Sequence, residues 1–261
     1  MKTIILSDIH IDNAKHNIEP VTRDNVKQIL DDVLLKQNAD LLLIAGDISG
    51  DIIESINIVK HLNSKIIKTY WIPGNHEWWC RKPIEWYKKL SNIDTCLINK
   101  IVTEGDWDII GNTCWYDYSF SDKDNILVEK MKYTLWGDRF CNWKISDEEV
   151  NNIMLNDLEK CLKKSNNKKI VLSHMVPFKH FLRFKDADVS ITNGYMGSTK
   201  LGEMLKKYKV EYSIFGHTHL KMQEEYENIK CICNPLGYNH EFSYSYNFKK
   251  ELENSIVIVN L

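Results

Sequence analysis

Five short polar motifs, each directly after an apolar run, constrain this chain more than any other feature. The motifs are Asp8-Ile9-His10, Gly46-Asp47, Gly74-Asn75-His76-Glu77, His174 and Gly216-His217-Thr218-His219. The runs before them cover residues 3–6, 41–44, 68–72, 170–172 and 210–215, and they are rich in aliphatic and β-branched side chains, as buried strands are. Open α/β sheets bind their ligands at the carboxyl ends of the strands. We therefore expect all five motifs to meet in one site.

The donor atoms in these motifs indicate a site for two metal ions. The seven candidate ligands are Asp8, His10, Asp47, Asn75, His174, His217 and His219. Two four-coordinate ions need eight ligand positions, and one carboxylate that spans cations roughly 3.5–4 Å apart supplies the eighth. Asp47, isolated between Gly46 and a turn, is the expected bridge. Oxygen and imidazole donors suit Mn, Fe, Zn, Ni or Co better than Ca or an all-thiolate metal.

Alternate spacing within two motifs suggests how their side chains are directed. In the pairs Asp8/His10 and His217/His219, the members are two positions apart. On an extended segment this spacing places both side chains on one side. Glycines at positions 46, 74 and 216 leave room for tight backbone turns beside the ions.

The order D-x-H, G-D, G-N-H-E, H and G-H-x-H resembles the signature of the calcineurin-like metallophosphoesterase superfamily. The motifs run from Asp8 to His219, so the resemblance covers most of the chain. It implies an α/β fold, a four-layer sandwich of two mixed β-sheets flanked by helices. The resemblance also implies two ligand sets: Asp8, His10, Asp47 and His219 for one ion, and Asp47, Asn75, His174 and His217 for the other.

The resemblance further implies a hydrolytic reaction on a phosphoester. A hydroxide that bridges the two metal ions would attack phosphorus in line. His76 would stand over the substrate as a general acid or transition-state stabiliser, or alternatively would only orient its neighbours. Glu77 is expected to support the loop and not to bind metal.

Two branches of the superfamily fit the chain poorly. The protein Ser/Thr phosphatase branch has an Arg beside the second motif, but residues 46–51 read GDISGD. In the double-strand-break nuclease branch Leu-Gly follows the first motif and a DNA-binding domain follows the core, whereas residues 8–12 here read DIHID and the chain given has 261 residues.

The chain is more similar to small bacterial phosphoesterases. We therefore expect a small phosphodiester substrate, nucleotides included, with a phosphomonoesterase or a non-catalytic scaffold as alternatives; the sequence leaves the oligomeric state open.

Length and composition predict one domain over residues 1–261. Hydrophobic residues make up 43% of the chain, and no composition break divides it. One segment, at about residues 107–143, is unusually rich in aromatics: Trp107, Trp115, Tyr116, Tyr118, Phe120, Tyr133, Trp136, Phe140 and Trp143. We interpret it as an excursion beside the site, with core packing as an equal alternative. Trp78 and Trp79 could likewise stack on a nucleobase or aryl group, or pack in the core.

Charge and cysteine content indicate which cell compartment and which classes of partner to expect. A formal net charge of -2 argues against a broad surface for duplex nucleic acid. No apolar run approaches the roughly 18 residues of a membrane span, and the start of the chain does not resemble a signal peptide. Seven scattered cysteines, an odd number, predict free thiols in a reducing compartment. We therefore expect a cytoplasmic protein without membrane contact.

Periodicity predicts the elements that connect the motifs. Apolar residues at helical spacing indicate helices near residues 22–34 and 51–62, and Pro83 suits the first position of another. Ser146 and Glu149 form a capping box before a further helix. Residues 198–208 predict one more helix, and residues 229–234 and 255–261 predict edge or closing strands.

Overall fold

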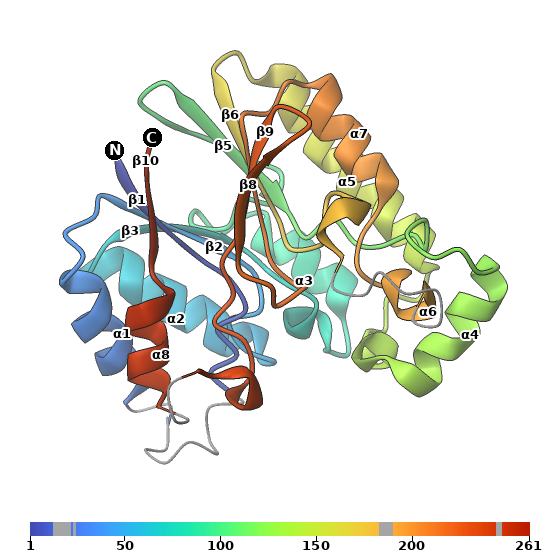
Figure 1. Ribbon diagram of the computed structural model, residues 1–261, viewed down its shortest axis with the longest axis horizontal. Helices are drawn as coiled ribbons and strands as arrows, with labels where there is room; N and C mark the ends of the chain where they lie inside the picture. The colour runs from blue at the N-terminus through green and yellow to red at the C-terminus, as the bar shows by residue number, and fades with distance from the viewer. Residues whose placement is uncertain (13–21, 23–24, 183–189, 244–246) are drawn as a thin grey trace.

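The computed structural model describes residues 1–12, 22, 25–182, 190–243 and 247–261 (Figure 1). Its strands are β1 (Lys2–Leu6), β2 (Leu41–Ala45), β3 (Lys68–Ile72), β4 (Ile101–Glu104), β5 (Trp107–Asn112), β6 (Lys168–Ser173), β7 (Tyr212–Phe215), β8 (Met222–Tyr226), β9 (Ile229–Cys233) and β10 (Val257–Asn260). Its α-helices are α1 (Val26–Leu35), α2 (Ile52–Lys65), α3 (Pro83–Leu90), α4 (Asn125–Leu135), α5 (Asp147–Lys164), α6 (Ser190–Asn193), α7 (Thr199–Lys207) and α8 (Phe248–Ser255). Short 3-10 turns are η2 (His76–Trp78), η3 (Gly137–Phe140), η4 (Lys179–Phe181) and η6 (Asn239–Glu241).

The strands form two mixed sheets, as the resemblance implied. The first sheet has the order β10-β1-β2-β3, in which β10 is antiparallel and the other three are parallel. The second has the order β4-β5-β6-β7-β9-β8, with four parallel strands in the middle and an antiparallel strand at each edge. The expectation of an edge or closing strand at residues 229–234 is therefore wrong for β9, which lies inside its sheet, and right for β10.

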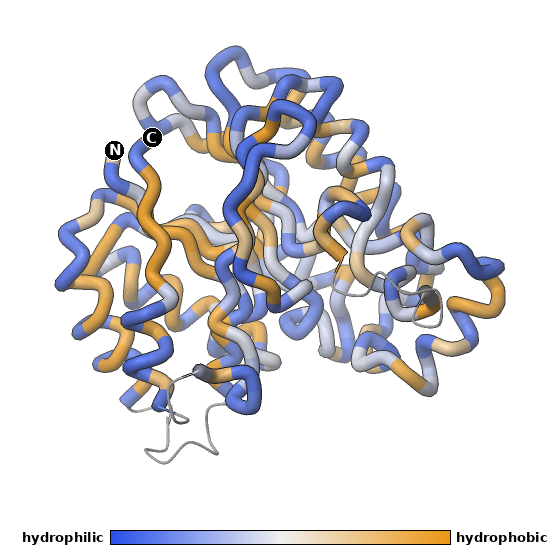
Figure 2. The backbone as a smooth tube through the Cα atoms, viewed as in Figure 1, coloured by the Kyte–Doolittle hydropathy of each residue, from blue (hydrophilic) through white to orange (hydrophobic). Residues whose placement is uncertain are grey.

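Alternating side chains of the parallel strands build the layers. In β2, Leu41 and Leu43 pack against the second sheet, whereas Leu42 and Ile44 pack with buried residues of α1 and α2. In the second sheet, Val171 packs with α5 and α7. Figures 1 and 2 show apolar strands at the centre, with α1, α2 and α8 beside the first sheet and α5 and α7 beside the second. The four-layer sandwich predicted from the sequence is confirmed.

The carboxyl ends of the two sheets' strands meet at one seam. Backbone hydrogen bonds join the segments that follow the strands: Asp8 N donates to Gly46 O at 3.0 Å, and Gly216 N donates to His174 O at 3.1 Å. The segments after β1 and β9 are joined in the same way, since Ser7 N donates to Asn234 O at 3.0 Å. Backbone hydrogen bonds thus help to hold together motifs that are distant in sequence.

The aromatic-rich segment lies partly in the core and partly outside the sheets. It begins inside the second sheet, because Trp107 starts β5. Trp115, Tyr116 and Tyr118 are buried among core residues, whereas Phe140 is 58% exposed. Core packing therefore describes the first half, and α4 with η3 forms a layer outside the sheets (Figure 1).

A buried ion pair fastens this outer layer to α5. Lys132 in α4 contacts the carboxylate of Asp147 at the start of α5, and both side chains are less than a tenth exposed. The same carboxylate accepts hydrogen bonds from the indole of Trp115, at 2.8 Å, and from the hydroxyl of Tyr118. Four polar groups are therefore satisfied together in an apolar setting.

Replacing Asp147 by Asn should reduce the free energy of unfolding by about 3–5 kcal/mol, because the ammonium of Lys132 stays buried without its counter-charge. Urea unfolding followed by circular dichroism measures the loss. A matched control is Glu85→Gln, which removes the exposed ion pair with Lys82 and should change stability by less than about 1 kcal/mol. Equal losses in the two variants would contradict this prediction.

Candidate metal centre

The structure brings all seven candidate ligands together at the seam. Ligand atoms of Asp8, His10 and His219 lie within 4.8 Å of one another, and so do those of Asp47, His174 and His217. The seventh, Asn75, joins the second cluster, because its Oδ1 lies 2.9 Å from His174 Nε2. His76 belongs to a third grouping, with His10 and Asp47.

Asp47 lies between the two clusters. Its Oδ2 is 3.7 Å from Nε2 of His10 in one cluster and 3.3 Å from Nε2 of His174 in the other. Its Oδ1 is held in place by the backbone N–H of His76 at 2.9 Å. This is the position that a bridging carboxylate requires.

The distances and the imidazole contacts fit divalent cations. Two ligands about 2.1 Å from one ion lie about 3.0–3.4 Å apart, and His10 Nε2 is 3.1 Å from His219 Nε2. Three of the four imidazoles in the clusters turn their other nitrogen to an oxygen: His174 to Ala45, His217 to Tyr195 and His219 to Glu241. Metal-bound histidines are oriented in this manner. Asp8 Oδ2 is also buried without a hydrogen-bond partner among the described residues.

The backbone at the seam is wound in an unusual conformation. Asp8, His10, Asp47, His217 and His219 all have positive φ, between 45° and 68°. Such angles are uncommon outside glycine and cost free energy, which indicates that the surroundings impose them. The expectation of extended Asp8/His10 and His217/His219 pairs is therefore wrong: β1 and β7 end before the motifs, and His217 and His219 enter different clusters.

Close packing at two glycines explains their place in the motifs. A Cβ atom at position 46 would lie 2.5 Å from His174 Nδ1, and one at position 74 would lie 2.1 Å from Asp47 Oδ1. Gly46 also has a φ of 86°. Any side chain at either position would displace a candidate ligand.

Burial and mutual charge shift the pKa values of the histidines in opposite directions. Burial lowers the pKa of His10 and of His217 to about 3, so both imidazoles are neutral and able to bind a cation. Burial also disfavours the charged form of His219, but hydrogen bonds to Asp8 and Glu241 outweigh it and raise the pKa to about 10. In the metal-free chain, imidazolium groups therefore balance part of the buried negative charge.

Glu77 organises the loops that carry the second and third motifs. Its carboxylate accepts backbone N–H bonds from residues 47, 48, 49 and 74 at 2.7–3.1 Å, and the hydroxyl of Ser55 at 2.9 Å. Burial and the charge of Asp47 raise its pKa to about 7, against the lowering by backbone bonds from Ser49 and Gly74. The expectation that Glu77 supports the loop agrees with these contacts.

Three residues at the site were missed in the sequence. Tyr238 Oη lies 3.1 Å from His76 Nε2, and Glu241 Oε2 lies 2.6 Å from His219 Nδ1. Both follow β9, which ends at the same seam with a Pro and a Gly after it, so its strand-end position was the available signal. The third, Asp138, accepts a hydrogen bond from the amide of Asn75 and lies in the aromatic-rich segment.

A cavity of about 320 Å³ opens above the clusters. Its lining comprises Asp47, Asn75, His76, Trp79, Leu135, Trp136, Gly137, Met196, His217, Thr218, His219, Tyr238 and Glu241. Trp79 stacks on His76 with a ring-centroid distance of 3.7 Å, whereas Trp78 is fully buried and bonds to Thr113. Of the two interpretations of this pair, a place at the site describes Trp79 and packing in the core describes Trp78.

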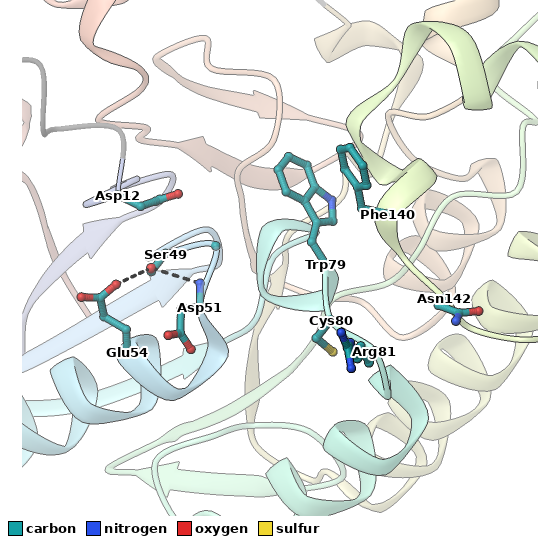
Figure 3. A pocket seen from close by; sticks show the side chains of 10 residues that line it. Asp12, Ser49, Asp51, Glu54, Trp79, Cys80, Arg81, Phe140 and Asn142 are labelled. Carbon is teal, nitrogen blue, oxygen red and sulfur yellow. Dashed lines mark hydrogen bonds between the residues drawn. The ribbon is translucent and has the colours of Figure 1, made fainter.

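A wider groove of about 710 Å³ adjoins this cavity at Trp79. Figure 3 shows its two sides: Asp12, Ser49, Asp51 and Glu54 on one, and Trp79, Cys80, Arg81, Phe140 and Asn142 on the other. Trp79 thus separates the clusters from a groove with both acidic and basic side chains.

Comparison with known families identifies the fold and the general activity. A family model described as calcineurin-like phosphoesterase matches residues 1–221. The chain belongs to this family. Members use divalent metal ions, and the His/Asp clusters described above could bind them. A phosphoester hydrolase is therefore the activity that the family supports, and small phosphoesters are the substrates that fit it.

Two relatives with curated names are cyclic nucleotide phosphodiesterases. One, from Nostoc, is 38% identical over 29% of this chain and 27% of its own length; a probable one, from Vesicomyosocius okutanii, is 24% identical over 98% of this chain and 96% of its own. An uncharacterised protein of Acanthamoeba polyphaga mimivirus is 27% identical over 77% of this chain and 79% of its length. A phosphopantetheinyl hydrolase from Mycobacterium tuberculosis has a similar fold, with a TM-score of 0.71, 17% identity, and coverage of 99% of this chain and 95% of its own. None of the described helices has the length and apolar character needed to cross a bilayer.

Changing Glu77 to Gln should destabilise the chain by about 2–3 kcal/mol, because an amide must turn its NH₂ group toward at least two N–H or O–H donors. Thermal unfolding of the metal-free protein measures this loss. Changing exposed Glu225 to Gln in β8 is the matched control and should have little effect. If Glu77→Gln unfolds at the wild-type temperature, the organising role is wrong.

Proposed function

We propose that this chain hydrolyses phosphodiesters at a centre of two divalent metal ions. The observation that carries the proposal is the pair of clusters joined by Asp47, whose Oδ2 lies 3.7 Å from Nε2 of His10 and 3.3 Å from Nε2 of His174. The proposed ligands are those predicted from the sequence: Asp8, His10, Asp47 and His219 for one ion, and Asp47, Asn75, His174 and His217 for the other. Such ions, when bound, lower the pKa of a water molecule and neutralise charge on the phosphoryl oxygens.

The lining of the cavity supports a diester over a monoester. A diester carries one negative charge and a second substituent, whereas a monoester carries up to two charges. Among the described residues that line the cavity, none is Lys or Arg, while Trp79, Trp136 and Tyr238 offer aromatic faces to a substituent. The Nostoc and Vesicomyosocius relatives are named as phosphodiesterases, which points the same way.

His76 is the proposed proton donor to the leaving oxygen. Its side chain is 7% exposed, lines the cavity, and is not needed to complete either four-ligand set. Trp79 covers one face of the ring, and Tyr238 Oη is 3.1 Å from Nε2, so the imidazole is fixed in direction. A fixed donor at this place can protonate a leaving group as the bond to phosphorus breaks.

Two other functions stay as alternatives. Arg81, in the adjoining groove, could attract a second negative charge, which would favour a monoester. A non-catalytic scaffold is the other alternative, and retention of all seven candidate ligands argues against it. The seven cysteines, all free thiols, support the proposed cytoplasmic location.

Loaded with Mn²⁺, the purified chain should hydrolyse bis(p-nitrophenyl) phosphate with a kcat/KM at least about tenfold above that for p-nitrophenyl phosphate, a difference of about 1.4 kcal/mol in the barrier. Release of nitrophenol measures both rates. Asp47→Asn, the control, should lower the diester rate at least about 100-fold by loosening both ions. A monoester preference would reject the diester proposal, and a chain that neither binds metal nor hydrolyses either ester would favour the scaffold.

His76→Ala should slow hydrolysis of a diester with an alkyl leaving group by about 10²–10⁴-fold, because the departing alkoxide then lacks a proton donor. With a nitrophenyl leaving group the loss should be less than about tenfold, since nitrophenolate needs no proton. Tyr238→Phe is a graded comparison that keeps the imidazole and removes only its hydroxyl partner. Equal losses with the two leaving groups would indicate that His76 orients the site without donating a proton.

A further inference from the structure

One buried carboxylate from the aromatic-rich segment reaches the centre. Asp138 lies in η3 and is 0% exposed. Its Oδ1 accepts hydrogen bonds from the amide Nδ2 of Asn75 and the indole Nε1 of Trp79, each at 2.8 Å, and its Oδ2 accepts one from the indole Nε1 of Trp136 at 2.9 Å. Three N–H donors thus meet one acceptor group.

The bond to Asn75 determines which end of the amide faces the candidate metal ions. A carboxylate only accepts, so it draws the NH₂ group of Asn75 to itself. The amide oxygen is then directed the other way, to within 2.9 Å of His174 Nε2. An amide free to rotate would present its NH₂ group, which cannot bind a cation, for part of the time.

The other two bonds hold aromatic side chains beside His76 and His217. Trp79 stacks on His76 at 3.7 Å, and Trp136 lies edge-on to His217 at a ring-centroid distance of 5.9 Å. Both indoles line the cavity. Asp138 therefore connects a candidate ligand with the two indoles that a bound substituent would contact.

Gly137, the residue before Asp138, leaves room for the indole of Trp79. A Cβ atom at position 137 would lie 2.6 Å from Cζ2 of Trp79, so Gly137 lets η3 approach the indole. Ordinary packing needs neither this close approach nor a carboxylate among apolar side chains. Burying such a charge costs free energy unless hydrogen-bond donors surround it.

We propose that Asp138 is a positioning residue: it orients Asn75 toward the metal ions and fixes Trp79 and Trp136 as the walls of the substrate cavity. The assignment rests on the proposed two-metal function. It also gives the outer layer of α4 and η3 a role in the reaction, as the part of the chain that supplies the substrate walls and orients one ligand.

The experiment is a calorimetric titration of the metal-free full chain with Mn²⁺, which needs no substrate. Asp138→Ala should weaken one of two binding steps about 10- to 100-fold, as loss of a group that orients a ligand does, and leave the other within about twofold. The control is Asp108→Asn, which alters a buried carboxylate near the amino end of β5 that accepts hydrogen bonds from Thr103 and Ser165, and it should leave both steps unchanged.

A rescue pair separates orientation from general damage. In Asp138→Asn, the new NH₂ group must face at least one N–H donor, so Mn²⁺ binding weakens. Adding Trp136→Phe removes the donor at Oδ2 and should restore the affinity to within about threefold of that of Trp136→Phe alone, a residual of about 0.7 kcal/mol. Steady-state kinetics of the same variants should show a raised KM for the diester in every variant that frees an indole.

The proposal is overturned if Asp138→Ala binds two Mn²⁺ ions as the wild type does, if Asp108→Asn weakens the same step equally, or if Trp136→Phe gives no rescue. Failure of the proposed function has a different signature. In that case the Mn²⁺ titrations behave as described while no phosphodiester is hydrolysed. A wild-type chain that binds no Mn²⁺ overturns both proposals.

Discussion

Two acidic side chains, Asp8 and Asp47, lie almost without solvent in the same seam, and the rest of the structure depends on how their charge is balanced. A buried carboxylate is stable only when positive charge or hydrogen-bond donors surround it. Here the donors are backbone N–H groups of other motifs, at His217 for Asp8 and at His76 for Asp47, together with imidazoles. The fold therefore concentrates negative charge where divalent cations would be the strongest compensation.

Rigidity of the seam follows from the same arrangement. Left-handed backbone angles at five candidate ligands would relax if the loops were free, so neighbouring contacts must hold them. Glu77 is one such contact, since four backbone N–H groups from two motifs converge on it. Asp138 and Glu241 act similarly from outside the motifs, on Asn75 and His219. Three carboxylates that bind no metal in the proposed scheme thus hold the groups that would.

The sequence predicted the family and the sandwich, and both are confirmed, because the strand-end motifs and the apolar runs before them are local patterns. It also predicted which seven side chains would meet; the structure brings them together, while their role as ligands stays a prediction. Tyr238 and Glu241 also follow a strand, but that signal indicates the site only if β9 lies inside its sheet, and the sequence predicted an edge or closing strand there. Local patterns could not predict Asp138, because two of its three partners, Trp79 and Asn75, are 59 and 63 positions away. The extended form expected for Asp8/His10 was wrong because β1 ends at Leu6, and backbone bonds to Gly46 and Asp47 then hold both residues at positive φ.

Pairing of β1 with β10 has a consequence for how the centre assembles. Thr3 in β1 is opposite Leu41 on one side and Val259 on the other, so the strand before Asp8 is fixed by segments from near both ends of the chain. Contacts of such wide separation form late, since closing long loops opposes them until much of the chain is ordered. Residues up to about 260 would therefore have to leave the ribosome before the Asp8 motif could settle, which would place the candidate metal centre among the last features of this fold to mature.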